Sequence, residues 1–161
     1  MAPRLRELGF NAQLLTTFVQ GEAAQIAKVA VALGYEVQDS GHPLAAPACL
    51  ILGGETTVTL GANPGRGGRN QELALAAALE LDGHDGITIV SLATDGTDGP
   101  TDSAGGMADG DTVARGHAAG LDAADHLRRH DAYPFLAATG DLLMTGPTQT
   151  NVNDLVFVFV K

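Results

Sequence analysis

Residues 70–92 read NQELALAAALELDGHDGITIVSL, and this stretch decides the fold class. Its first half, residues 70–81, is rich in Ala and Leu with apolar side chains on the successive turns of a helix. After a short turn that contains glycine, residues 87–92 form a β-branched run typical of a buried strand. A helix followed directly by a core strand predicts an α/β domain.

Further elements are predicted on both sides of this stretch. The patterns predict helices over residues 21–33, 112–119 and 122–130, with Gly34 ending the first, and strands over residues 35–38, 49–52, 56–60, 141–144 and 155–160. Only Gly53, Gly54 and Glu55 separate two of these strands, which predicts a tight hairpin. We therefore expect a layered α/β domain whose mixed, partly parallel sheet is flanked by helices.

The composition limits the classes of function. The 161 residues are 45% hydrophobic and 17% charged, which is typical of one globular domain. A formal net charge of −10 argues against nucleic acid or an anionic membrane surface as the partner. The chain has neither a spanning apolar segment nor a signal-peptide pattern, and its single cysteine, Cys49, lies in an apolar run typical of a core. We expect a cytoplasmic protein that binds neither membrane nor nucleic acid.

A glycine-rich segment leads into the predicted helix over residues 70–81. The sequence GRGGRNQE, residues 65–72, places unpaired backbone N–H groups and the positive end of a helix dipole beside Arg66 and Arg69. An arginine there can bind a carboxylate or phosphate through two parallel hydrogen bonds. The segment matches neither a P-loop nor GxGxxG. It predicts an anion site or, alternatively, a glycine loop with solvated arginines.

A second loop is rich in carboxylates. The sequence TDGTDGPTD, residues 94–102, follows the core strand, and α/β sheets bind ligands at the carboxyl ends of their strands. Asp95, Asp98 and Asp102 could hold Mg²⁺, orient a hydroxyl group or accept its proton, and alternatively they only cap turns. His126 and His130 lie four residues apart on a predicted helix, and we expect both at the surface.

Four segments in order resemble the signature segments of the MOFRL domain: GGETTV (53–58), GRGGRNQELAL (65–75), TDGTDGPTDSAGG (94–106) and GPTQTNVNDL (146–155). This is the C-terminal domain of the type II glycerate kinases, which are also called hydroxypyruvate reductases. The segment GFNAQLLTTFVQGEA (9–23) is similar to the lead-in of that domain. The chain departs from the family pattern at Gln149, where Gly is usual, and at His130, where Asn is common.

The resemblance implies one MOFRL-like domain over residues 1–161, with residues 1–20 as a lead-in, and an absent N-terminal Rossmann-like kinase domain. It implies ATP and Mg²⁺ as cofactors and glycerate as substrate, in a cleft between the two domains. Arg69 is implied to stabilise the transferring phosphoryl group or to bind the glycerate carboxylate, with Asp95 and Asp98 as catalytic residues and Mg²⁺ ligands. Other residues expected to bind substrate or phosphate are Gly53, Gly54, Glu55, Thr56, Gly67, Gly68, Asn70, Gln71, Thr97, Asp102, Asn151 and Asn153.

Three functional hypotheses follow. The favoured one is half of a glycerate kinase that is inactive until the N-terminal domain completes its active site, and whose uncovered face promotes homo-oligomers. The second is a stand-alone module that binds an anion or nucleotide without catalysis. The weakest is a hydroxypyruvate reductase, because the sequence lacks the dinucleotide fingerprint GxGxxG. Within the favoured hypothesis, we expect Arg69 to face the cleft and to contribute little to folding, and Arg66 to lie in a flexible part of the loop.

Overall fold

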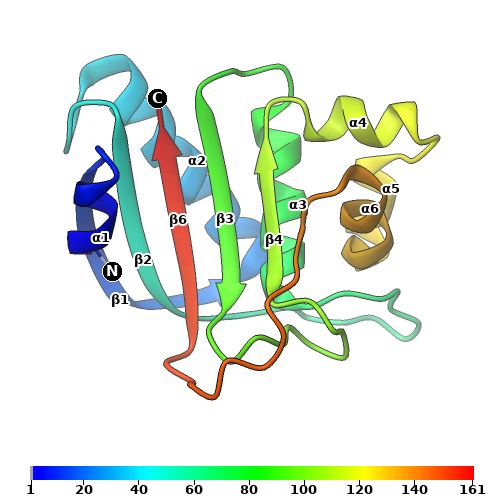
Figure 1. Cartoon of the computed structure of the whole chain (residues 1–161). Coiled ribbons are helices and arrows are strands. Elements are labelled where there is room, and N and C mark those ends of the chain that lie inside the picture. Colours follow the sequence, from blue (N-terminus) through cyan, green and yellow to red (C-terminus); the bar gives the residue numbers. More distant parts are fainter. Residues whose placement is uncertain (1) are drawn as a thin grey trace.

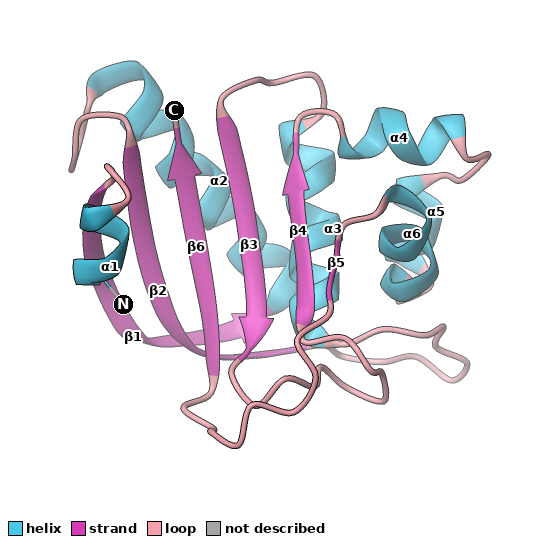
Figure 2. Cartoon of the chain, viewed as in Figure 1, coloured by secondary structure: helices cyan, strands magenta, loops and turns pink. Residues whose placement is uncertain are grey.

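Six strands form one mixed sheet in the computed structural model, which describes residues 2–161. Their order across the sheet is β1 (Asn11–Glu22), β2 (Ala48–Thr57), β6 (Asp154–Val160), β3 (Ile87–Ala93), β4 (Gly105–Asp109) and β5 (Leu142–Leu143). β1 and β2 are parallel, whereas the other neighbouring strands are antiparallel. The predicted mixed, partly parallel sheet is confirmed (Figure 2).

Six helices in the described residues flank this sheet. They are α1 (Ala2–Glu7), α2 (Ala23–Ser40), α3 (Arg69–Leu81), α4 (Thr112–Ala118), α5 (Ala123–Arg128) and α6 (Ala132–Thr139). α2 and α3 cover one face of the sheet, α1 lies on the other face near β1 and β2, and α4 to α6 gather beside α3 (Figure 1). Among residues 2–161, no helix has the length and apolar character needed to span a membrane.

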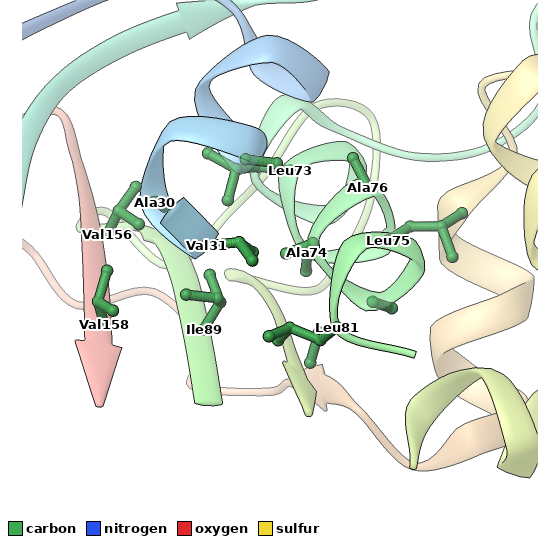
Figure 3. Packing of buried hydrophobic residues seen from close by; sticks show 14 of the residues in the cluster. Ala30, Val31, Leu73, Ala74, Leu75, Ala76, Leu81, Ile89, Val156 and Val158 are labelled. Atoms are coloured by element: carbon green, nitrogen blue, oxygen red, sulfur yellow. The ribbon is translucent and has the colours of Figure 1, made fainter. Parts of the chain in front are cut away.

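The main core lies between the sheet and the two long helices. Ala30 and Val31 of α2 and Leu73 of α3 pack toward Ile89 and Val158 of the sheet, and each of these is at most 2% exposed (Figure 3). α3 is buried around most of its circumference because the sheet covers one side and α4 to α6 cover the other. Close packing on all sides makes α3 a rigid support for the residues at its first turn.

A smaller core lies on the opposite face of the sheet, under α1. Cys49, Ile51 and Phe157 form it, and Leu5 of α1 packs against them. Cys49 is fully buried, and burial raises the pKa of its thiol to about 12. A thiol with so high a pKa is not a nucleophile at neutral pH, which confirms that Cys49 is a core residue.

The predicted hairpin is wrong. Residues 48–57 form one continuous strand, β2, whose antiparallel partner is the distant β6. The glycines that suggested a turn serve another purpose, because a Cβ atom on Gly54 would collide with the backbone of Val19 in β1. The glycine therefore allows two parallel strands to approach closely instead of reversing the chain.

The predicted strand over residues 35–38 is also wrong. α2 continues through Gly34 and ends at Gly41, which has the left-handed conformation (φ 72°) that glycine adopts at helix ends. A Cβ atom on Gly34 would lie 2.9 Å from a methyl carbon of Ile87. Gly34 is thus a close contact between helix and sheet, which a local pattern cannot distinguish from a helix end.

Four elements were not predicted, and the first is the short helix α1, which contains no buried residue. β1 is formed by much of the expected lead-in; it is an edge strand with mostly exposed side chains, so it lacks apolar alternation. β4 begins with Gly105 and Gly106, and glycines weaken the sequence pattern of a strand. α6 contains Pro134, which its first turn tolerates. The other predicted helices and strands are present, with small shifts of their ends.

The loops that carry the motifs meet at one end of the sheet. Residues 58–68 follow β2, residues 94–104 join β3 to β4, and residues 144–153 precede β6. All three lie at the lower end of the sheet in Figure 1, where β3 ends and β4 and β6 begin. This end of the fold therefore holds the candidate site.

Candidate functional site

Asp98 fills the N-terminus of α3. Its carboxylate accepts hydrogen bonds from the backbone N–H groups of Asn70 (3.1 Å) and Gln71 (2.9 Å), and from the Asn70 side chain (3.1 Å). Asp98 is 1% exposed, and burial raises the pKa of its carboxyl group. The N–H groups expected to bind an external anion are satisfied from within the chain. We therefore correct the expected role of Asp98 from catalytic residue and Mg²⁺ ligand to helix cap.

Arg69, the first residue of α3, is held by two carboxylates. Its Nε and Nη2 donate to Oδ2 and Oδ1 of Asp154 at 2.5 and 3.0 Å, and Nη1 lies 3.3 Å from Oε1 of Glu55. The hydrogen bonds to Asp154 raise the pKa of the Arg69 guanidinium. The Asp154 side chain is 5% exposed and that of Arg69 is 34% exposed. The pair is therefore partly buried. These contacts favour a contribution of Arg69 to stability, contrary to the expectation that it contributes little to folding.

A cavity of about 260 Å³ opens beside Arg69. At its polar end, Nδ1 of His130 lies 2.9 Å from Oε1 of Glu72. Burial raises the pKa of Glu72, although its hydrogen bond with His130 acts in the opposite direction. The remaining lining consists of apolar and glycine residues, namely Val58, Leu60, Pro64, Gly65, Gly67, Gly68, Gly99 and Pro100.

Asp95 connects two of the three loops. Its Oδ1 accepts a hydrogen bond from the backbone N–H of Thr97 (3.0 Å), and its Oδ2 lies 3.4 Å from the donating Nδ2 of Asn151. Nearby, the carbonyl oxygen of Asn153 accepts hydrogen bonds from the backbone N–H and the hydroxyl of Thr94. Asp95 is half-buried, whereas Thr97, Asn151 and Asn153 are exposed. The structure thus brings these predicted residues together.

Arg66 and Asp102 form a separate surface cluster with Tyr133 of α6. The Arg66 guanidinium lies 3.7 Å from the centroid of the Tyr133 ring, and its Nη2 lies 3.3 Å from Oδ1 of Asp102. The Tyr133 hydroxyl donates to the same oxygen at 2.7 Å, which lowers the pKa of Asp102. Neither Arg66 nor Asp102 lines the cavity.

The remaining predicted residues have mainly structural contacts. Asn70 accepts a hydrogen bond from Ser91 of β3 (2.6 Å), and Gln71 donates one to Thr101 (2.8 Å). Both residues are buried and attach α3 to the sheet and to the 94–104 loop. Gly53, Gly54 and Thr56 lie within β2, and Thr56 is buried. Of the predicted residues, Gly67, Gly68 and Arg69 line the cavity. Glu55 does not line it but forms an ion pair with Arg69.

Sequence reasoning missed three residues of the site. Asp154 is a lone carboxylate at the start of an apolar strand, and Glu72 ends the segment GRGGRNQE. The sequence position of each residue, next to a predicted site segment, could have indicated it. His130 was expected at the surface and instead pairs with Glu72, while His126 is 8% exposed with its Nδ1 2.9 Å from the carbonyl oxygen of Asp131. No local pattern could have predicted these histidine contacts.

The described residues fit Mg²⁺ only as part of a shared site. Within residues 2–161, no group of three or more His, Cys, Asp or Glu side chains is arranged to hold a metal ion. Mg²⁺ is usually bound by one or two carboxylates together with substrate phosphates and water. Both oxygens of Asp95 also accept hydrogen bonds, but Asp95 is half-buried and therefore more accessible than Asp98, which is 1% exposed and caps α3.

The fold and the site define an α/β domain that offers a cavity, an arginine at a helix N-terminus and a carboxylate loop at one end of its sheet. Residues 48–154 match the model of the MOFRL family. The chain belongs to the MOFRL family.

Similar proteins carry the names of glycerate kinases and of a hydroxypyruvate reductase. The chain is 49% identical over 151 residues to D-glycerate 2-kinase of Thermotoga maritima, covering 94% of this chain and 36% of that protein. It is 42% identical over 160 residues to glycerate 2-kinase of Pyrococcus horikoshii, covering 99% of this chain and 36% of the relative. A relative from Agrobacterium vitis whose name refers to hydroxypyruvate reductase is 41% identical, over 96% of this chain and 35% of the relative. The chain thus spans about a third of the length of these relatives.

Solved structures agree with these relationships. The crystal structure of a glycerate kinase from T. maritima superposes with a TM-score of 0.95 at 46% identity, covering 99% of this chain and 38% of that one. The crystal structure of a P. horikoshii protein superposes with a TM-score of 0.92 at 42% identity, over 99% of this chain and 36% of that one. The fold described above therefore matches the fold of part of the T. maritima glycerate kinase.

Proposed function

We propose that this chain is the C-terminal domain of a glycerate kinase and forms one wall of a cleft in which glycerate is phosphorylated by ATP. The observation that supports this most directly is Arg69, held by Asp154 at the first turn of α3 beside the cavity. The similarity to glycerate 2-kinases supports the reaction, and the coverage of 36% of those relatives supports the missing half.

The charges of the residues around the cavity explain why this domain needs the N-terminal domain to bind its substrates. Arg69 is the cation that lines the cavity, and it already faces the carboxylates of Asp154 and Glu55. Glu72 adds a third carboxyl group at the polar end. A triphosphate or glycerate anion therefore finds little net positive charge here, so cations must come from the other half of the cleft and from Mg²⁺ that arrives with the nucleotide.

Within this proposal, each residue has a defined task. The Arg69 guanidinium stabilises charge on the transferring phosphoryl group or binds the glycerate carboxylate. Asp95, held by Thr97 and Asn151, supplies one carboxylate to Mg²⁺ or accepts the proton of the attacking hydroxyl group. Asp98 keeps α3 in place and so positions Arg69.

The test separates the chain from the completed enzyme. The purified chain should show no ATP-dependent phosphorylation of glycerate above background, because phosphoryl transfer needs positioning and charge neutralisation from both walls. Adding the separately produced N-terminal domain should restore turnover, with the full-length D-glycerate 2-kinase of T. maritima as the positive control.

Two outcomes would contradict the proposal. Robust turnover by the chain alone would show that it is not half of a site. Nucleotide binding without turnover in the mixture, while the control enzyme is active, would favour a binding module that has no catalytic role. Oxidation of NADH or NADPH with hydroxypyruvate, which we expect to be absent, would favour the reductase hypothesis.

A further inference from the structure

We propose that the cavity beside Arg69 binds the nucleobase of the phosphoryl donor, with the Glu72 carboxylate accepting a hydrogen bond from the amino group of adenine. This inference rests on the proposed kinase function. It assigns the base to the part of the cavity lined by Glu72 and His130, and it leaves Arg69 to the phosphoryl group or the glycerate carboxylate. The argument uses the charge, the walls and the polar end of the cavity in turn.

The charge around Glu72 and His130 favours an uncharged group over the anionic parts of the substrates. Two carboxylates, those of Asp154 and Glu55, already neutralise Arg69. The other ionisable groups of the lining are Glu72 and His130, which pair with each other. Glycerate is a small anion and the triphosphate carries several negative charges, so neither gains a free cation inside this cavity. The base is the uncharged part of the nucleotide.

The walls suit a flat ring. Val58, Leu60, Pro64 and Pro100 provide apolar surface, and several glycines bring backbone close to the cavity without side chains. Its volume of about 260 Å³ lies just below the roughly 300–1,000 Å³ typical of pockets for drug-sized ligands. A ring system with its sugar partly outside therefore fits this volume better than a complete nucleotide does.

The polar end selects a hydrogen-bond donor. Among residues 2–161, the Glu72 carboxylate has one hydrogen-bond partner, His130, which contacts Oε1 and leaves Oε2 available. An ionised carboxylate accepts hydrogen bonds and cannot donate them. It therefore favours adenine, whose 6-amino group donates, over hypoxanthine, whose 6-oxo group accepts. Glu72 is 6% exposed on the buried helix α3, so its position is well defined.

The experiment uses nucleosides, which carry no phosphate. The ¹⁵N-labelled chain is titrated with adenosine and, separately, with inosine, and backbone amide shifts are followed by NMR. Adenosine should give saturable shifts at Leu60, Gly67 and Gly99 with a Kd on the order of 1 mM, as expected for a small ligand in an open site. Inosine should bind about fivefold more weakly, the effect of one unmatched hydrogen bond. Equal affinity for both nucleosides, or no shift at these residues, would overturn the inference.

A pair of matched variants tests the assigned contact. Glu72→Gln keeps the shape but adds an amide donor, so adenosine should bind about fivefold more weakly and inosine more tightly. Glu80→Gln makes the same change on the same helix at an exposed position and should leave both affinities unchanged. If Glu72→Gln does not fold, Leu60→Ala replaces it, with Leu8→Ala as control, because Leu60 and Leu8 are 58% and 59% exposed. Leu60→Ala should weaken adenosine binding about threefold through lost apolar contact.

The result is separable from the kinase test. If adenosine does not bind the cavity while the reconstituted enzyme phosphorylates glycerate, the base lies elsewhere and only this inference fails. If adenosine binds as described but the reconstituted protein is inactive, the cavity assignment stands and the proposed reaction fails.

Discussion

Arg69 is both a structural and a candidate functional residue. Its guanidinium joins the start of α3 to Glu55 of the preceding strand β2 and to Asp154 of β6, which is 85 residues away in the sequence. The same group is the cation that lines the cavity. A substitution at this position therefore changes the stability of the domain and the charge presented to a ligand at the same time.

Arg69→Ala should lower the rate of the reconstituted enzyme about a hundredfold or more, the effect of removing one donor that stabilises transition-state charge. Arg69→Lys should recover part of the rate because it keeps the charge and loses the forked geometry. Arg66→Ala is the internal control, since Arg66 pairs with Asp102 outside the cavity. Steady-state kinetics of the three variants measure these rates. Full activity of Arg69→Ala together with loss of activity in Arg66→Ala would show that the anion binds Arg66 instead.

Arg69→Ala should also destabilise the folded domain. Arg69→Ala leaves the carboxylate of Asp154 buried without its partner, which should cost about 2 kcal/mol after discounting for the partial exposure of Arg69. Urea unfolding of the isolated chain gives this value. In a double-mutant cycle, Asp154→Ala should cost less in the Arg69→Ala background than in the unmodified chain, because the pair is already broken.

At the scale of elements, the first turn of α3 is capped by Asp98, a residue of the loop over residues 94–104. The N-cap, Gly68, has no side chain to cap the helix, and Asp98 provides the carboxylate instead. Gly68 itself packs so closely on Asp98 that a Cβ atom there would collide with the carboxylate. The glycines of the 65–68 segment therefore permit the contact of two loops, and the anion at this helix end belongs to the protein.

Asp98→Asn should reveal this cap through a pH-dependent change in stability. Burial raises the pKa of Asp98 in the folded chain, so the folded state binds its proton more tightly than the unfolded state does. The stabilising contribution is complete below the unfolded pKa of about 3.9 and decreases as the pH rises through the higher folded pKa. The difference in free energy of unfolding between the unmodified chain and Asp98→Asn should therefore shrink as the pH increases from about 3.9. A difference that grows with pH in urea titrations would show that Asp98 has a lowered pKa instead.

At the scale of the whole molecule, one edge of the sheet is open. β1 is the edge strand, it contains no Lys, Arg or Pro, and its Phe18 and Leu14 are 85% and 51% exposed. Edge strands are usually protected by charges, proline or a covering element. Exposed apolar side chains also lie in the loops of the candidate site, at Leu60, Met144 and Val152.

The isolated chain should therefore self-associate, and association should increase with salt because screening reduces the repulsion between chains of net charge −10. Phe18→Lys should shift light-scattering profiles toward the monomer. Val29→Lys is the matched control, because Val29 is 52% exposed on the helix α2 and offers no free strand edge, so this change should leave the profile unchanged. A strictly monomeric profile of the unmodified chain at high concentration and high salt would contradict this prediction.

Local sequence patterns predicted those elements whose burial on most sides gives them a clear apolar pattern. α3, β3 and β6 are buried on most sides, so continuous or helical apolar patterns mark them. The pattern failed at glycines, because Gly34 and Gly54 allow close packing of neighbouring elements and resemble a helix end and a turn in the sequence alone. It also failed for the exposed edge strand β1, which has no buried face to mark it.

The sequence by itself determined that the chain is an α/β domain of the MOFRL family, because apolar periodicity and ordered motifs are local features of the chain. It also pointed to the loops around residues 65–72, 94–102 and 146–154 as the candidate site. Only the tertiary structure decided the state of each charged group in those loops. Asp98 binds residues 27 and 28 positions away, and Arg69 binds Asp154 at a separation of 85 residues. Which carboxylate caps a helix, neutralises an arginine or stays available to a ligand depends on such distant contacts, and no local pattern records them.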